Sequence, residues 1–397
     1  MKQNLRLFRP MTALCVTGIF LISIQATPEA RAAAPGQSVT WQQNITHDGF
    51  DSASTLVTPL TLKWRRDLTS SGVTSISYPL IAQGLVFITV TTSSAVESLM
   101  ALNETTGVTV WSASVDGTYS FANAAYDSGK VFAVNFDGLM KAFDASTGTQ
   151  LWSVLLTPQY AFTSPPSAAR GIVYVGGAGS GGTLYAVDES NGTIIWTAGV
   201  ENGDHSSPAI SNGRVFVSYA CPQSYGFDAL SGQLLWHYSG SCEGGGGKTP
   251  VVHGGGVYVR DAFFTPTDGL ILSLKTGRRR GQFQSERPPA FAGNLGVDYQ
   301  SGTLRGVDAR DQTVLWSFAG DGGLTSAPLI VNQTIYIGSS SGLLYGLDFD
   351  GQEVWSTQVG APIPAPDEQN AFLTTGFGAG DGLLVIPAGS ILAAYGN

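Results

Sequence analysis

The stretch Ala142-Phe-Asp144-Ala-Ser-Thr147-Gly148-Thr-Gln-Leu-Trp152 decides the fold of this chain. An apolar strand ends at Asp144, whose carboxylate can accept hydrogen bonds from nearby backbone N–H groups. Gly148 can adopt the positive φ that closes a tight turn, and a second strand then carries Trp152. The pattern therefore predicts a β-hairpin.

The same hairpin pattern recurs along the chain. Copies with the same eight-residue spacing run from Asn103 to Trp111, Asp188 to Trp196, Asp228 to Trp236 and Asp308 to Trp316. Two copies differ: Asp348 reaches Trp355 in seven residues, and Lys275 and Phe283 keep the spacing but change both residues. Ahead of each hairpin a short strand turns into a β-branched one, as in Pro208-Ala-Ile-Ser-Asn-Gly213-Arg-Val-Phe-Val.

The starts of these repeats set the number of structural units. They are Pro79, Ala124, Pro166, Pro208, Pro250, Pro288, Pro328 and Phe377, which lie 38 to 49 residues apart. That period is typical of four-stranded propeller blades and excludes a helical solenoid. We therefore predict an all-β, eight-bladed propeller of antiparallel blades. Seven blades is the alternative if the Pro288 repeat is not a true blade.

The two ends of the repeat region complement each other. The last repeat stops at Ile391–Tyr395 without a fourth strand, whereas Leu60–Asp67 reads as a fourth strand with its Trp64 but without predecessors. We expect the N-terminal strand to complete the last blade, because closure pairs edges that an open ring would expose. The propeller then spans residues 60–397.

These repeats resemble the pyrroloquinoline quinone (PQQ) type, shared by quinoprotein dehydrogenases and by outer-membrane assembly factors of the BamB family. The Ala-x-Asp-x-x-Thr-Gly-x-x-x-Trp motif that carries the resemblance is specific for the fold and not for quinone binding. The resemblance implies that the motif's Trp docks on the neighbouring blade. The residues to which this role is assigned are Trp64, Trp111, Trp152, Trp196, Trp236, Trp316 and Trp355.

The N-terminus predicts export. Residues 1–33 combine basic side chains, an apolar stretch and small residues suited to cleavage, which is typical of a signal peptide and too short for a membrane span. Cys15 follows Leu14 where a lipoprotein signal needs a small residue, so we expect a soluble secreted or periplasmic protein. Residues 34–59 form an extension, which we expect to plug or brace one face of the ring.

Charge and cysteines narrow the possible partners. The formal charge is −9, and the only basic run, Arg278–Arg280, falls at a turn where solvated side chains are expected. This disfavours a nucleic acid or an anionic membrane as partner. Cys221 and Cys242 each follow a strand end on the same face, and an exported protein allows a disulfide between them.

Binding residues are expected on the face that carries the long connections. The candidates there are Tyr119, Tyr160, Phe162, Asp204, His205, Phe263 and Phe264. They could form a recognition surface, although exposed aromatic residues are also common without any function.

The sequence carries no convincing catalytic site. Its four His residues lack metal-ligand spacing, and no Cys-Cys pair or recurring acidic cluster accompanies the strands expected to line the channel. The leading prediction is a monomeric, non-catalytic scaffold without a cofactor, which binds another exported or envelope protein or an extracellular polymer. One alternative is a PQQ-dependent oxidoreductase with calcium. Another is a glycan-binding or glycan-cleaving propeller that uses Glu201, Asp204, Asp261 or Asp268.

Overall fold

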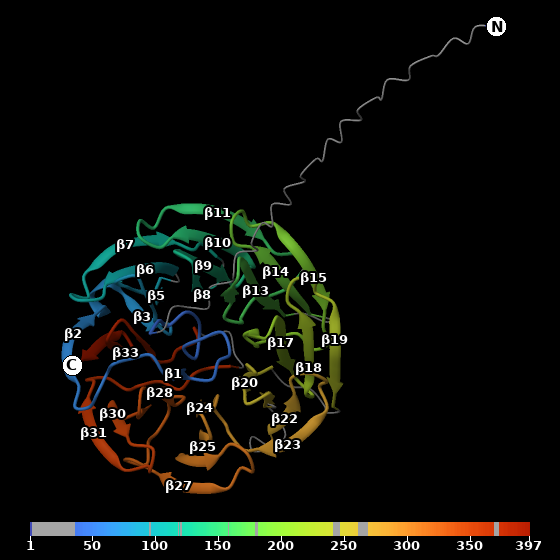
Figure 1. The fold of residues 1–397 in the computed structure, drawn as a ribbon. Helices are drawn as coiled ribbons and strands as arrows, with labels where there is room; N and C mark the ends of the chain where they lie inside the picture. Colours follow the sequence, from blue (N-terminus) through green and yellow to red (C-terminus); the bar gives the residue numbers. More distant parts are fainter. Residues whose placement is uncertain are drawn as a thin grey trace. The chain divides into compact units, whose positions relative to one another are not determined.

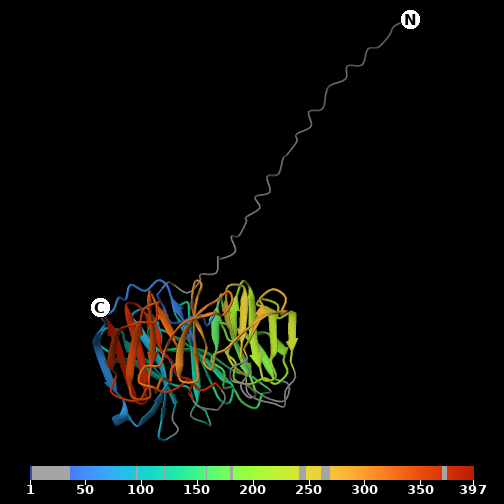
Figure 2. The ribbon, with the colours of Figure 1, turned by 90° about the horizontal axis from the view of Figure 1, so that it is seen from below.

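The computed structural model describes Met1 and residues 36–397, except 95–96, 118, 120, 158, 179–181, 241–246, 261–268 and 369–372. The predicted signal peptide, residues 1–33, thus lies outside the described residues apart from Met1. Residues 36–397 form eight antiparallel sheets arranged around a ring (Figure 1). The edge-on view shows the blades standing side by side (Figure 2). The predicted eight-bladed propeller is confirmed, and the Pro288 repeat forms a complete blade.

We number the blades in chain order. The first contains β3 (Val73–Ile76), β4 (Leu80–Ala82), β5 (Leu85–Thr92), β6 (Glu97–Asn103) and β7 (Thr109–Ser114), and the second β8 (Ala122–Asp127), β9 (Lys130–Asn135), β10 (Leu139–Asp144) and β11 (Gln150–Leu155). The third contains β12 (Ser167–Ala169), β13 (Ile172–Gly177), β14 (Thr183–Asp188) and β15 (Ile194–Gly199), and the fourth β16 (Ala209–Ser211), β17 (Arg214–Tyr219), β18 (Gln223–Asp228) and β19 (Leu234–Ser239).

The other four blades follow the same meander. The fifth contains β20 (Val251–His253), β21 (Gly256–Val259), β22 (Gly269–Ser273) and β23 (Arg279–Phe283), and the sixth β24 (Ala290–Ala292), β25 (Leu295–Gln300), β26 (Thr303–Asp308) and β27 (Val314–Phe318). The seventh contains β28 (Leu329–Val331), β29 (Thr334–Gly338), β30 (Leu343–Leu347) and β31 (Glu353–Gln358), with β1 (Phe50–Asp51) pairing parallel to β28. The eighth contains β32 (Gly378–Gly380), β33 (Leu383–Ala388), β34 (Ile391–Gly396) and β2 (Thr61–Asp67). A short 3-10 turn, η1, spans Thr69–Ser71.

The ring closes as the sequence predicts. Strand β2 pairs antiparallel with β34, so that Trp64 lies opposite Ala394, and the N-terminal strand becomes the outer strand of the last blade. Closure removes the unpaired sheet edge that β34 would otherwise present. Among the described residues, no helix has the length and apolar character needed to cross a membrane.

Tryptophan residues join neighbouring blades. In six of the seven Trp positions the indole N–H donates to a backbone carbonyl in the hairpin turn of the next blade. These bonds join Trp64 to Glu104, Trp111 to Ala145, Trp152 to Glu189, Trp196 to Ala229, Trp236 to Leu274 and Trp316 to Phe349. The turn glycine of the receiving blade lies directly against each indole, for example Gly192 against Trp152. Trp355 instead packs edge-on against Tyr336 and Tyr395.

The fifth blade breaks this pattern, at a different residue from the one predicted. Spacing from Lys275 assigns the Trp position to Phe283, but the register places Gly281 opposite Ile271, as Trp236 lies opposite Gly226. The hairpin turn begins at Ser273, whose carbonyl accepts the Gly277 N–H. The assignment of Phe283 was therefore wrong by two residues.

Candidate functional site

The two faces of the ring differ. The turn face carries the tight connections within each blade, such as Asn212-Gly213, where both residues have positive φ. The loop face carries the connections between second and third strands and between successive blades. The N-terminal extension lies at the centre of the ring (Figure 1). Its carbonyls accept hydrogen bonds from the inner strands of successive blades, through Tyr126, Ile210, Val252, Phe291 and Ile330.

His47 is the central side chain of this extension, and it is fully buried. Its Nδ1 lies 2.7 Å from the carbonyl of Trp41, and its Nε2 lies 3.2 Å from the carbonyl of Pro208. Burial lowers the pKa of His47 to about 4, because charging the ring would cost solvation. Trp41 is also buried, and its indole N–H donates to Thr375 at 3.2 Å. The chain's own side chains thus pack the centre of the ring.

A buried ion pair lies on the loop side of His47. Arg260, at the end of β21, donates two hydrogen bonds to Glu368, which belongs to the connection between β31 and β32. The Glu368 carboxylate also accepts the backbone N–H of Thr249 at 3.1 Å. Burial, with the nearby charge of Arg260, lowers the pKa of the neighbouring Lys248 to about 8.

The described residues do not fit a quinone cofactor held on the axis with a calcium ion. Trp41, His47, Arg260 and Glu368 are buried side chains of the chain itself inside the ring. Each of the four side chains has at least one hydrogen-bond partner within the chain. In the described part of the chain, His, Cys, Asp and Glu form no group of three or more that could hold a metal ion. We therefore derive no redox step for this chain.

The structure divides the predicted loop-face residues. Tyr119 and Tyr160 are exposed, with relative accessibilities of 60% and 80%. Phe162 is fully buried, with its ring against Gly138 and Tyr185, and His205 is 8% exposed. These two expectations are corrected: neither side chain contributes to an exposed recognition surface. Phe263 and Phe264 lie outside the described residues.

Asp204 and His205 form a partly buried pair. His205 Nε2 lies 3.2 Å from Asp204 Oδ1. Burial lowers the pKa of His205 and raises that of Asp204, so the low-polarity surroundings oppose charge on both groups. For the glycan alternative, Asp261 and Asp268 lie outside the described residues.

A pocket of about 700 Å³ lies on the loop face between the first blade and the connection that precedes β32. Tyr119, Phe136, Pro364 and Leu373 provide its apolar walls, and Asp367 adds a carboxylate. The rings of Tyr119 and Phe136 meet edge to face, with centroids 4.7 Å apart. An exposed aromatic side chain thus borders a concave apolar surface, an arrangement suited to binding a side chain of a partner.

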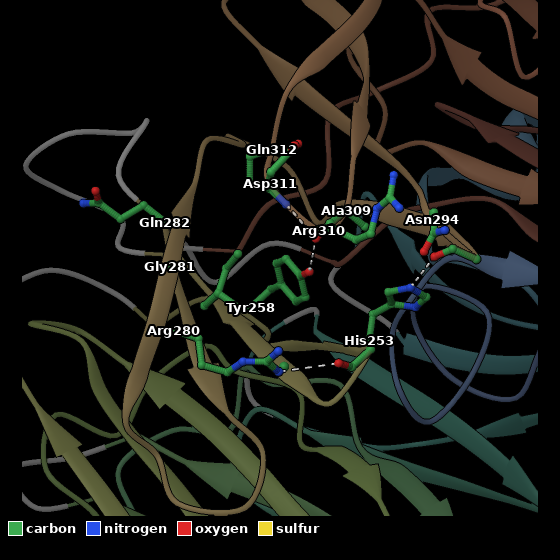
Figure 3. A pocket seen from close by; sticks show the side chains of 14 residues that line it. His253, Tyr258, Arg280, Gly281, Gln282, Asn294, Ala309, Arg310, Asp311 and Gln312 are labelled. Atoms are coloured by element: carbon green, nitrogen blue, oxygen red, sulfur yellow. Dashed lines mark hydrogen bonds between the residues drawn. The ribbon is translucent and has the colours of Figure 1, made fainter.

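Sequence reasoning missed a second pocket. It lies at the outer part of the turn face between the fifth and sixth blades, has a volume of about 660 Å³, and is lined by residues that include Tyr258, Arg280, Gly281 and Gln312 (Figure 3). We call it the rim pocket. The signal in the sequence is the missing Trp of the fifth repeat, which the assignment of Phe283 concealed.

Cys221 is disulfide-bonded in the structure. Its predicted partner, Cys242, lies outside the described residues, so the pairing of these two cysteines stays a prediction. Cys221 is 7% exposed and follows β17 on the loop face.

Comparisons with known proteins agree with the fold. A curated relative, the outer membrane protein assembly factor BamB of Shewanella oneidensis, is 24% identical over 308 residues, which cover 67% of this chain and 75% of the relative. The quinone-dependent alcohol dehydrogenase subunit of Gluconobacter oxydans is 29% identical over 188 residues, covering 41% of this chain and 24% of that protein. The solved structure of BamB from Moraxella catarrhalis matches with a TM-score of 0.65 and 17% identity, over 85% of this chain and all of that one. At this identity the structural likeness shows the fold alone.

A family model gives the assignment. The model described as "Outer membrane protein assembly factor BamB" matches residues 136–294 and 300–387, more than half of the chain. These ranges run from β10 in the second blade to β33 in the eighth, with a gap at residues 295–299 in the sixth. The chain therefore belongs to the BamB family of PQQ-like repeat propellers.

Proposed function

We propose that this chain is an exported, non-catalytic propeller that binds another protein of the cell envelope through its loop face. The observation that carries the proposal is the packing of the axis. Trp41, His47, Arg260 and Glu368 are buried inside the ring, and each has a hydrogen-bond partner within the chain. The relatives named as outer membrane protein assembly factors support an envelope role. The matched regions cover 75% and 86% of the length of two of them.

The loop-face pocket is the proposed contact surface. Tyr119 borders it and is 60% exposed, and Phe136, Pro364 and Leu373 line it. Aromatic residues at the edge of a concave apolar surface are frequent contributors to binding energy. Asp367 adds a carboxylate beside these apolar residues.

Photocrosslinking tests the proposed surface. A photoreactive benzoyl-phenylalanine is placed at Tyr119 in cells of the source organism, and a matched control carries it at Leu230, which is 71% exposed in a tight turn of the fourth blade. We expect a discrete crosslink to an envelope protein from position 119 and none from position 230. Equal labelling from both positions, or none from 119, contradicts the proposed surface.

A ligand titration tests the non-catalytic assignment separately. Purified protein is titrated with PQQ and Ca²⁺ while its thermal midpoint is followed. A ligand that binds the native state must raise this midpoint. We expect no saturable rise, whereas a saturable rise would overturn the non-catalytic assignment.

A further inference from the structure

The rim pocket exists because one blade junction has lost its tryptophan. At the other motif positions the Trp faces a small residue across the hairpin: Ala101, Ala142, Ala186, Gly226, Gly306 or Gly346. In the fifth blade the large and the small residue have exchanged strands: Ile271 lies on the third strand and faces Gly281 on the fourth. The Ile271 side chain is shorter than an indole and stays on its own strand, so it does not reach the next blade as an indole would.

The receiving blade has changed at the matching position. Elsewhere a turn glycine lies under the indole, and a Cβ built on Gly232 would come within 2.6 Å of Trp196. In the sixth blade this position is Gln312, with a φ of 65°. A residue with a side chain fits there because no indole lies above it. The fifth blade thus lacks the indole, and the sixth blade lacks the glycine on which an indole would pack. Together these two differences leave a pocket at this junction.

Two side chains partly replace the missing indole N–H. In the other junctions the indole donates to a turn carbonyl, and the equivalent carbonyl here belongs to Ala309. The hydroxyl of Tyr258 lies 3.5 Å from this oxygen, and Gln312 Nε2 lies 3.2 Å from it (Figure 3). The first distance is at the long limit for a hydrogen bond. Gln312 thus supplies the ordinary hydrogen bond to this carbonyl, and the contact from Tyr258 is weak, beside a space of about 660 Å³.

The rim pocket holds one guanidinium without an ion-pair partner among the described residues. The protein carries a formal charge of −9, yet Arg280 lines the pocket beside the exposed Arg278 and Arg279. Within the described part of the chain Arg280 forms no ion pair, and its closest polar contact is the Gly254 carbonyl at 3.5 Å. Arg310, also in the lining, is held by the Asp308 carboxylate, and Asp311 adds one negative charge. The free guanidinium of Arg280 favours an occupant with carboxylates.

We propose that the rim pocket docks a segment of a partner protein in which an aromatic side chain is flanked by acidic residues. The aromatic ring would take the place that an indole fills in the other junctions, between Tyr258, Gly281 and Gln312. The flanking carboxylates would pair with Arg280, which can also stack on the ring face. The site lies on the turn face, so it is separate from the loop-face contact and does not depend on it.

Peptide binding tests this inference directly. The probe is a fluorescein-labelled acidic peptide, Asp-Glu-Trp-Glu-Asp, and its binding to the full mature chain is followed by fluorescence anisotropy. Two control peptides replace the Trp by Ala or the four acidic residues by Lys. We expect saturable binding of the acidic Trp peptide and at least roughly tenfold weaker binding of each control, as for the loss of a hot-spot side chain.

A variant that restores the tryptophan junction gives the decisive comparison. Ile271→Ala, Gly281→Trp and Gln312→Gly together recreate the arrangement of the neighbouring junctions, and filling the cavity is expected to preserve or raise the thermal midpoint. Peptide binding should be lost in this variant. Arg280→Glu, an exposed change that keeps the fold, should weaken binding of the acidic peptide at least tenfold.

Two results would overturn the proposal. One is equal binding of the Trp and Ala peptides to the wild-type chain, and the other is unchanged binding by Arg280→Glu. Tyr119→Ala serves as the control for the loop face and should leave peptide binding unchanged. A chain that binds the peptide but yields no crosslink from position 119 would retain the rim site while losing the proposed loop-face function.

Discussion

The guanidinium of Arg260 donates two hydrogen bonds to the carboxylate of Glu368, at 2.7 and 2.8 Å, and both side chains are almost fully buried. Arg260 belongs to the fifth blade, whereas Glu368 lies 108 residues later, in the connection to the eighth blade. The pair therefore fixes a long connection against the inner end of a distant blade. Thr249 completes the arrangement by binding both partners through its backbone.

Removing one member of this pair should destabilise the protein strongly. Arg260→Ala leaves the Glu368 carboxylate buried without its counter-ion, which typically costs about 3–5 kcal/mol. The double variant Arg260→Met with Glu368→Leu removes both charges and should lose much less. Chemical denaturation measures both free energies of unfolding. A single variant as stable as the wild type would contradict the assignment of a fixed ion pair.

An exposed ion pair provides the control for this comparison. Arg310 pairs with Asp308 at the surface of the sixth blade, and the Arg310 side chain is 70% exposed. Because solvent screens such pairs, Arg310→Ala should leave the unfolding midpoint close to that of the wild type.

Alanine substitutions at two glycines with similar backbone conformations can distinguish the cost of crowding a tryptophan from the cost of backbone strain. Gly192 and Gly213 have φ values of 77° and 70°. A Cβ on Gly192 would lie 2.7 Å from the Trp152 ring, whereas a Cβ on Gly213 would meet nothing within 4 Å. Gly213→Ala should cost about 1–2 kcal/mol for the left-handed backbone alone. Gly192→Ala should cost a further 1–3 kcal/mol, roughly, for overpacking against the indole.

Equilibrium unfolding of both variants in urea tests this difference. Equal destabilisation would mean that the indole yields easily and that the junction is not tightly packed. A third variant, Trp152→Phe, tests the same junction from the other side. It removes only the hydrogen bond to Glu189 and part of the ring area. Its expected cost is about 1 kcal/mol for the hydrogen bond, plus the area lost.

The hairpins could be predicted from the sequence because their chemistry is local. Asp144 Oδ1 accepts hydrogen bonds from the backbone of Ser146 and Thr147, within three residues of itself. Hydrogen bonds from Ser146 and Thr147 also lower the pKa of Asp144, which keeps the acceptor charged. The number of blades and the closing strand followed by counting such units.

The candidate sites were harder to predict because exposure in a loop depends on distant residues. Phe162 is buried because Gly138, in the loop between β9 and β10, leaves room for its ring: a Cβ on Gly138 would lie 2.4 Å away. The rim pocket depends on the register between β22 and β23, which places Gly281 rather than Phe283 opposite Ile271. The Thr-Gly pair of the turn carries this register in the sequence, because Gly281 follows Gly277 by four residues as Trp152 follows Gly148. Counting from Lys275 instead of from the Thr-Gly pair concealed it.

Glu97 predicts a pH-dependent stability. It is 5% exposed, and neither carboxylate oxygen has a hydrogen-bond partner among the described residues. Burial, with a smaller contribution from the charge of Asp137, raises the pKa of Glu97 to about 8. The folded state thus holds a proton that the unfolded state releases near pH 4.5, so stability falls as pH rises from about 4.5 to 8.

The variant Glu97→Gln isolates this contribution. Glutamine keeps the shape of the protonated acid without titrating, so the difference in thermal midpoint between variant and wild type should be small at pH 5. It should grow in favour of the variant towards pH 8. A difference that does not change with pH would show that Glu97 titrates normally in the folded protein.

The N-terminal extension should stabilise the ring through Gln43. Its side chain donates to the Ala379 carbonyl at 2.6 Å and accepts the Ala379 N–H at 2.9 Å, so it binds the inner strand of the eighth blade as a paired backbone would. Gln43→Ala leaves both buried groups of Ala379 without partners, at a cost of about 1–3 kcal/mol each. Gln83→Ala is the matched control, because Gln83 also has a positive φ of 57° but is exposed. Hydrogen exchange at Ala379 should accelerate in the first variant and not in the second. Equal exchange in both would mean that the extension lies against the blades without holding them.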